Sequence, residues 1–438
     1  MADNPLLITN TDISGALKNL YADFRINAFP ILTPLLSQVK KGRPGGPERM
    51  RWGGNGVYWD VQLTRPVGMS ASDAGFFPPT AAAVEKQANL GIKRTYVRRQ
   101  IDALSIAGTS DKEAAFIPLA RKIINEAMDA AKLGQQQILH GAGDGVLGVT
   151  TTNTSDTEKV VTRPYGITSG GPGGLLLDVG QFVAIYRTNL TTLQGTATIS
   201  AVTNSGDNAT ITLDGAGIPS NATTDVVVMA NTASDTSVSQ VPNGLTNILN
   251  RGNSYANFES INAATYARWD SVRLTAGTDT PDAGQPSEMD VWTMAAKVAG
   301  RSGKDAQLTP DEFLLLSTPG VEKALAESFL GQRRWEADDK VVLKGGFKAV
   351  RIMGIPLVRD YWCPAGTLYL VHLPSLTWVD RQDWIKLQYE DSGPWRFLAG
   401  RDAYEVNFGS YWNFGCLMRS SHCIVTGYTD TVRYSHEV

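Results

Sequence analysis

Cysteine and histidine are scarce in this sequence, with 3 and 4 residues respectively among 438. Cys363, Cys416 and Cys423 are an odd number of cysteines and too few for a disulfide framework in so long a chain. Disulfide-poor chains are typical of reducing compartments, which is where we expect this protein to be synthesised. His140, His372, His422 and His436 are too scattered to indicate a catalytic dyad or a metal triad.

Recognisable catalytic and ligand-binding motifs are also missing. Gly143-x-Gly145-x-x-Gly148 matches the dinucleotide fingerprint formally, but that fingerprint needs a strand before it and a helix after it. Here the glycines follow a predicted helix, and we interpret them as its end. Cys416, His422 and Cys423 have no second ligand pair at zinc spacing, and we expect His372 to be a hydrogen-bonded interior residue of an apolar strand. We therefore predict no catalytic, cofactor-binding or metal-binding residue, no cofactor and no enzyme.

Strong charge and long apolar runs are absent too. The formal net charge is -3, and 19% of the residues are charged, which excludes a strongly basic nucleic-acid binder. No apolar run approaches the roughly 18 residues that a membrane helix needs, and Met1 to Pro5 lacks the pattern of a signal peptide. We expect no membrane partner.

What the chain does contain begins with a long β-hairpin. Apolar and polar residues alternate from Val57 to Leu63, which is the period of a strand. We expect the return strand over Leu90 to Ile106, where neither face is cleanly apolar or reads as buried in a monomer, and a long loop over Arg65 to Asn89. Arg94 and Arg98 could contact phosphate, although basic residues on an exposed ribbon more often pair with acids across an interface or protect an edge from aggregation.

A long helix is predicted to follow the hairpin. Ser110-Asp-Lys-Glu113 is a capping box, and apolar residues then recur at helical spacing as far as Leu139. Pro118 removes one backbone donor near the start, so we expect irregular first turns. The helix should end near Gly141.

The amino-acid composition changes twice in the rest of the chain. Leu175 to Met229 is poor in charge and rich in Thr, Val, Asn and Gly, which predicts a small antiparallel barrel or sandwich inserted into a host domain. From Pro242 onward, helices and strands are interspersed without a βαβ period, so we predict an α+β fold. The expected strands of the insert are Gln181–Thr188, Gly195–Thr203, Ala209–Leu213 and Asp225–Ala230; the later helices are Ile261–Leu274, Met289–Ala299 and Val321–Leu330, and the last two strands are Trp378–Tyr389 and Ala403–Cys416.

The order of these features resembles a major capsid protein of tailed bacteriophages with the Hong Kong 97-type fold. The resemblance covers nearly the whole chain. It rests on Thr80 to Gly91 leading into the Arg-rich return strand, on Ala-Met-Asp-Ala-Ala-Lys at Ala127 to Lys132 in the long helix, and on the strand run that begins Gly354-Ile-Pro-Leu-Val-Arg-Asp360.

The resemblance implies a domain organisation. Lys86 and Lys93 lie in the loop, but nothing in the sequence shows a partner Asn with an activating acid, so we do not assign a covalent cross-link. About 50 residues precede the loop, so any scaffolding would be a separate protein. The implied parts are an N-terminal arm (1–50), an extended loop (51–107), the spine helix of a peripheral domain (108–141), an axial domain (142–372) with an inserted all-β domain at about 175–232, peripheral-domain strands (373–417) and a C-terminal segment that returns to the axial domain (418–438).

The function implied is that of a structural protein. Copies would self-assemble through hexamers and pentamers into the icosahedral head of the virion, after synthesis and assembly in the host bacterial cytoplasm. Scaffolding, portal and decoration proteins are candidate further partners. The head would enclose double-stranded DNA and contact it weakly and without sequence specificity, which fits the near-neutral charge.

Two alternatives remain open from the sequence. An encapsulin-like cellular compartment shares this fold and would differ by a cargo pocket and a smaller particle. A glycan-binding β-rich adhesin would explain the Thr-rich insert but would leave the long helix and the arm without a role.

Overall fold

A computed structural model describes most of the chain. The predicted arm lies largely outside the described residues, as does the capping box Ser110–Glu113. The described residues are 34–39, 41–42, 51–54, 56–66, 69, 82–104, 119–153, 155–166, 174, 177–205, 208–215, 217–219, 225–232, 236, 238, 240–249, 257–281, 284–329, 340–342, 348–386, 395–398 and 400–430.

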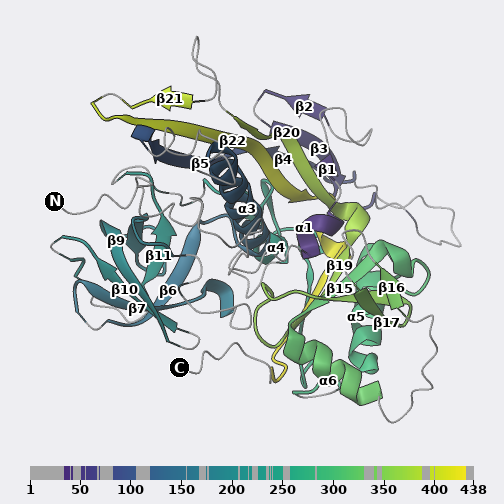
Figure 1. Ribbon diagram of the computed structural model, residues 1–438. Helices are drawn as coiled ribbons and strands as arrows, with labels where there is room; N and C mark the ends of the chain where they lie inside the picture. The colour runs from purple at the N-terminus through teal and green to yellow at the C-terminus, as the bar shows by residue number, and fades with distance from the viewer. Residues whose placement is uncertain are drawn as a thin grey trace, which may run out of the picture.

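The long helix α3, Leu119–His140, stands at the centre of the molecule (Figure 1). In this view a long sheet lies above it, a closed barrel to its left and a seven-stranded sheet to its lower right. The architecture is mixed α and β, as predicted. Among the described residues, no helix is long and apolar enough to cross a membrane.

The long sheet is built around β22, Ala403–Cys416. One edge of β22 pairs with β20, Leu376–Lys386, and with the short β21, Trp395–Phe397, while β5, Lys93–Asp102, pairs antiparallel with its other edge. The short β1, Lys41–Gly42, is parallel to β20. The side chains of Val406 and Phe408 on β22 pack against Ala127 of α3, so the helix covers one face of this sheet.

The hairpin is shorter than predicted. β2 (Arg51–Gly53), β3 (Gly56–Gln62) and β4 (Glu85–Gly91) form a three-stranded sheet, in which β3 pairs with β4 from Gly56 to Gln62. The return strand predicted over Leu90 to Ile106 is therefore wrong, because β4 ends at Gly91 and the chain then joins β22 as β5. Sequence alternation could not reveal this, since the partner strand lies about 300 residues further along the chain.

The expectation that neither face of the return strand is buried holds for most of β5, where residues from Lys93 to Gln100 are half-buried or exposed. Ile101 on β5, at 0% exposure, and Leu90 on β4, at 1%, are the exceptions. Basic residues lie on both faces of β5, so its sequence shows no alternation of apolar and polar residues. Other elements of the same chain bury Ile101 and Leu90.

The predicted helix is confirmed from Leu119 to its end at His140; the part before residue 119 lies outside the described residues. Gly143 and Gly145 follow it with φ values of 77° and 73°, so they form the turn that leaves the helix, as interpreted.

A closed barrel follows α3 directly. The strands expected between 175 and 232 are present, but the barrel also contains β6 and β7, so its predicted start near 175 is wrong. The sequence did not reveal this start because β7 contains charged residues, and the chain becomes poor in charge only after β7. One of these charged residues, Lys159, is 0% exposed in the structure. The closed order is β10-β7-β6-β11-β8-β9, where β6 is Val146–Asn153, β7 Glu158–Thr162, β8 Phe182–Tyr186, β9 Leu193–Ser205, β10 Asn208–Leu213 and β11 Val226–Met229.

The last large unit is a mixed sheet flanked by α5, Glu288–Ser302, and α6, Pro319–Phe329, both close to the predicted ranges. β14 is parallel to β23 and β15 is parallel to β18, while the other neighbours are antiparallel. The order is β14 (Val272–Thr275), β23 (Cys423–Thr426), β19 (Thr367–His372), β15 (Phe313–Ser317), β18 (Ile355–Arg359), β17 (Lys348–Ile352) and β16 (Lys340–Val342).

The helix predicted over Ile261 to Leu274 is wrong. This segment holds β13 (Ile261–Asn262), a 3-10 turn (Ala267–Trp269) and β14, because pairing of Val272 to Thr275 with β23 outweighs the local helical spacing. The remaining short elements are α1 (Pro34–Gln38), α4 (Leu245–Ile248), β12 (Asn257–Phe258) and 3-10 turns at Pro164–Gly166, Pro310–Glu312, Leu373–Ser375 and Arg419–Ser421.

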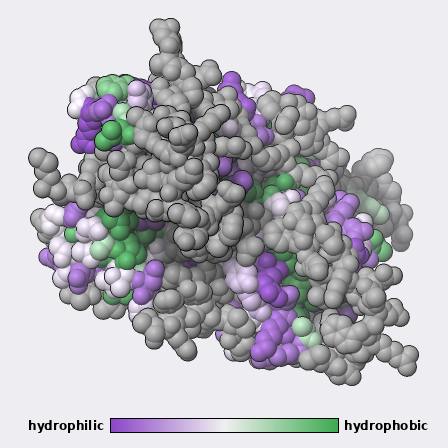
Figure 2. Space-filling model, viewed as in Figure 1, coloured by the Kyte–Doolittle hydropathy of each residue, from purple (hydrophilic) through white to green (hydrophobic). Residues whose placement is uncertain are grey.

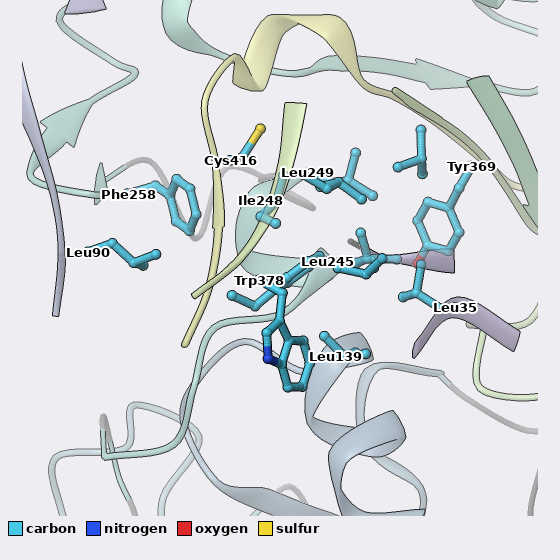
Figure 3. Close-up of a cluster of buried hydrophobic side chains, with 14 of the residues drawn as sticks. Leu35, Leu90, Leu139, Leu245, Ile248, Leu249, Phe258, Tyr369, Trp378 and Cys416 are labelled. Carbon is cyan, nitrogen blue, oxygen red and sulfur yellow. The ribbon is translucent and has the colours of Figure 1, made fainter. Parts of the chain in front are cut away.

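One apolar cluster joins these units (Figure 3). Leu139 at the end of α3, Trp378 on β20 and Tyr369 on β19 lie close to α1 and α4 in it, and Leu90 brings in the hairpin. The hairpin, the long helix and the two sheets therefore share a core.

Candidate functional site

The junction between the hairpin and the body is built around Glu259, in the turn between β12 and β13. The backbone oxygen of Glu259 accepts a hydrogen bond from the Asn89 N–H at 3.1 Å, and its side-chain Oε1 accepts one from the Cys416 N–H at 2.8 Å. Glu259 thus contacts β4 and the end of β22 together. The fit is close, because a Cβ on Gly415 would come within 2.6 Å of both Leu90 Cδ2 and Glu259 Oε1.

This junction is electrostatically unusual. Burial raises the pKa of Glu259 well above its ordinary value, although the Cys416 hydrogen bond and the charge of Arg419 both act to lower it. Arg419 is itself 0% exposed, and its guanidinium donates to the backbone oxygens of Ile248 at 2.5 Å and Asn247 at 2.8 Å. Burial lowers the pKa of Arg419 to about 10, which leaves it charged at neutral pH.

Cys416 and His422, which the sequence analysis considered and rejected as metal ligands, do lie together. His422 Nε2 is 3.0 Å from Cys416 Sγ and 2.9 Å from Ser375 Oγ, while His422 Nδ1 accepts the backbone N–H of His372 at 3.1 Å. Burial lowers the pKa of His422 to about 3 and raises that of the Cys416 thiol, so both are neutral at ordinary pH. A protonated thiol is a poor nucleophile and a poor metal ligand.

The structure adds no ligand set elsewhere. Within the described ranges, no group of three or more His, Cys, Asp and Glu side chains could hold a metal ion. His372 is 3% exposed and its Nε2 lies 3.1 Å from Glu312 Oε2, which confirms the predicted hydrogen-bonded interior residue. His436 lies outside the described residues.

A second polar contact joins α3 to the seven-stranded sheet, and sequence reasoning missed it. His140 Nε2 is 3.0 Å from Asp360 Oδ2, and Gln136 Nε2 donates to the same oxygen at 2.9 Å. Both helix residues are buried. The i, i+4 spacing of Gln136 and His140 was the available signal, but nothing local identifies Asp360 as the partner.

Arg94, Tyr96 and Arg98 share one face of β5, and all three are exposed. Arg98 Nε donates to Glu405 Oε2 at 2.9 Å, so this arginine pairs with an acid of its own chain. Tyr96 is 53% exposed, and its ring meets that of Tyr411 edge-on with centroids 6.4 Å apart. On the face drawn in Figure 2, coloured hydrophobic residues gather in small groups beside hydrophilic ones.

Comparisons with known proteins bear on the fold. No protein-family profile and no curated protein sequence matches the chain. A chain of the cyanophage A-1(L) capsid asymmetric unit is similar in structure, with 12% identity, a TM-score of 0.54 and coverage of 94% of this chain and 97% of that one. This chain shares the fold of a cyanophage capsid chain.

Two further structures are less similar. A chain from Mycobacterium phage Cain is 10% identical, with 97% of this chain and 99% of that one covered and a TM-score of 0.40. The holo-SrpI encapsulin complex from Synechococcus elongatus PCC 7942 is matched over 41% of this chain and 62% of that one, at 16% identity and a TM-score of 0.27.

Proposed function

We propose that this protein is the major capsid protein of a tailed bacteriophage, a structural component of the virion rather than an enzyme. The observation that carries the proposal is the fold shared with the cyanophage capsid chain over 94% of this chain and 97% of that one. Copies self-assemble into an icosahedral head that encloses double-stranded DNA.

The structural units fit the parts of a Hong Kong 97-type subunit. In this proposal α3 is the spine helix of the peripheral domain, together with the long sheet of β20 and β22. The seven-stranded sheet belongs to the axial domain, to which the C-terminal strand β23 returns by pairing with β14 and β19. The barrel from β6 to β11 is the inserted β domain, and the N-terminal arm reaches a neighbour.

The hairpin is the element best suited to bind another copy. β4 pairs with β3 on one side. On its other side the Asn89 N–H donates to the Glu259 oxygen and Asn413 Nδ2 donates to the Gly91 oxygen at 2.6 Å, so among the described residues the open part of this edge is Glu85 to Gln87. An open strand edge offers backbone donors and acceptors to a neighbour. A hairpin that lies across an adjacent subunit makes a heterologous contact, which closes into rings such as pentamers and hexamers.

A phage head implies further binding partners besides other copies of this chain. The net charge of -3 favours weak contact with packaged DNA, since affinity for DNA is set largely by phosphate contacts. Separate scaffolding, portal and decoration proteins complete the particle, and assembly takes place in the host bacterial cytoplasm.

Electron microscopy of the purified full chain, alone and coexpressed with its genomic neighbours, tests this function. Closed icosahedral particles or capsomer rings support it, and large heads that take up DNA separate a phage head from a small cargo compartment. A monomer that binds sugar and forms no particle under any of these conditions contradicts it and favours the adhesin.

A hairpin variant tests the proposed contact. Replacing residues 66–82 with a short Gly-Ser turn removes the end of the loop but keeps the paired residues of β3 and β4. We expect the thermal midpoint of the subunit to be unchanged and particles to be lost. A matched control inserts a Gly-Ser pair into the two-residue β9–β10 connection at 206–207 and should still assemble.

A further inference from the structure

A cleft of about 780 Å³ lies between the hairpin and the seven-stranded sheet. One wall is the end of the hairpin from Trp59 to Arg65, and the opposite wall comes from the 3-10 turn at Ala267–Trp269 and the end of α5. Residues of the turns after β19 and β22 close the bottom, among them Pro374 and Met418. A cleft of this size accommodates a ligand as large as a short peptide segment.

The charge of the cleft is one-sided. Four cationic side chains line it against the single carboxylate of Asp60. The cations are Arg65, Arg268, Arg301 and Lys304, of which the three arginines are exposed and Lys304 is half-buried. Within the described part of the chain, no ion pair joins any of the four to a carboxylate.

Two of the four cations are placed by contacts of their own. The guanidinium of Arg301 donates to the backbone oxygen of Ser271 at 3.3 Å and also to that of Ala267. Lys304 lies close enough to His372 for its charge to contribute to lowering the pKa of that histidine, mainly a result of burial. Glu312, the nearest acid to His372, is already hydrogen-bonded to it at 3.1 Å.

The inner lining of the cleft, below these charged side chains, is apolar. Trp59 is 5% exposed, Leu63 4% and Trp269 3%, and Leu417 and Met418 are half-buried beside them. A duplex presents a broad convex surface, whereas a recess with an apolar floor and a cationic rim suits an extended peptide that carries carboxylates at its sides.

We propose that this cleft binds a carboxylate-bearing segment of a second copy of this chain. The inference rests on the proposed assembly into a shell and names one of its contacts. Charge complementarity supports it, because the chain has 43 acidic against 40 basic residues, and four of the basic ones lie in this cleft with no ion-pair partner among the described residues. A segment seated there also touches Trp59 to Arg65 and so fixes the hairpin against the body.

Charge reversal on the rim gives the first test. We expect Arg268→Glu to raise the protein concentration needed for half-maximal assembly about tenfold, and Arg268→Lys to leave it near wild type. Arg401→Glu, which changes an exposed arginine in the β21–β22 turn, is the matched control and should assemble normally. Circular dichroism and the thermal midpoint check that each variant folds. Assembly of Arg268→Glu at the wild-type concentration overturns the proposal.

Cross-linking gives the second test and identifies the occupant. All three native cysteines are 0% exposed, so a thiol-reactive benzophenone attaches selectively to Arg268→Cys. Irradiated particles made from mixed ¹⁴N and ¹⁵N subunits should yield mixed-isotope peptides joining position 268 to an acidic segment. Cross-links confined to one copy, or to DNA in filled heads, overturn the assignment while leaving the particles as evidence for the shell. Failure of wild-type protein to form any particle would count against the proposed function instead.

Discussion

The side chains of His140 and Asp360 lie 3.0 Å apart, at 1% and 0% exposure, and so connect the last residue of α3 to the turn after β18. Asp360 also accepts hydrogen bonds from Gln136 Nε2 and the Trp362 N–H, each at 2.9 Å. A single carboxylate thus fixes the end of the long helix to the seven-stranded sheet. It adds a polar contact to the apolar core that these two units share.

Replacing Asp360 should destabilise the subunit strongly. Asp360→Ala leaves three buried donors without their acceptor, and we expect a loss of about 3 kcal/mol in the free energy of unfolding, measured in urea. Glu327→Ala is the control, since Glu327 pairs with Lys323 at 3.6 Å on the exposed face of α6 and should cost less than about 0.5 kcal/mol. Equal losses for both variants would show that the buried contact is unimportant.

Glu259 should make stability depend on pH. Burial raises its folded-state pKa, so unfolding releases its proton once the pH exceeds the ordinary carboxyl pKa, and the native state loses stability as the pH rises. Glu259→Gln keeps the shape without the charge. We expect it to match wild type below about pH 4 and to become relatively more stable toward pH 8 in urea titrations, given the ordinary carboxyl pKa of about 4.3. A constant difference between the two proteins across this range contradicts the prediction.

Two glycines with similar backbone angles should respond differently to alanine. Gly366 has φ 63° and Gly54 has φ 59°, but a Cβ at Gly366 would lie 2.2 Å from the backbone oxygen of Tyr428, whereas nothing lies within 4 Å at Gly54. Gly54→Ala should cost about 1 kcal/mol, from the left-handed conformation alone. Gly366→Ala should cost about 3 kcal/mol or more, because the β23 end must move. Thermal denaturation of both variants measures the difference, and similar midpoints would refute it.

The stacked indoles of Trp378 and Trp412 should stabilise the pairing of β20 and β22. Their rings are parallel within 6° with centroids 4.1 Å apart, and the Trp412 indole N–H donates to Thr95 Oγ1 at 3.0 Å. Trp412→Phe keeps an aromatic ring but removes the hydrogen bond and part of the stack, so we expect a loss of about 1–2 kcal/mol in urea unfolding. Trp292→Phe on the exposed face of α5 should change stability by less than about 0.5 kcal/mol; a comparable loss there would indicate a general effect of tryptophan content.

Local patterns were sufficient for several elements. The strand Ala403–Cys416 has the predicted ends, and α5 begins at Glu288, one residue before the predicted Met289, where Asp290 Oδ2 accepts the Ser287 N–H at 3.3 Å. These features depend on residues close together in the chain. Periodicity and capping chemistry encode them directly.

The candidate site was much less predictable. The scarcity of histidine and cysteine led to no predicted site residue, yet Glu259 and Asp360 become the buried carboxylates at the two junctions between units. Neither stands out in the sequence, because their burial is created by segments that are more than 150 residues away in each case.

The sequence by itself determined the α+β class, the long helix after Leu119, most barrel strands and the late strands, because each depends on local spacing of apolar and turn residues. Only the tertiary structure decided that β5 leaves the hairpin to pair with β22, that the barrel begins at Val146, and that Val272 to Thr275 is a strand. Those outcomes depend on pairing between distant segments, whose contacts compete with local propensity and leave no signal in a single sequence.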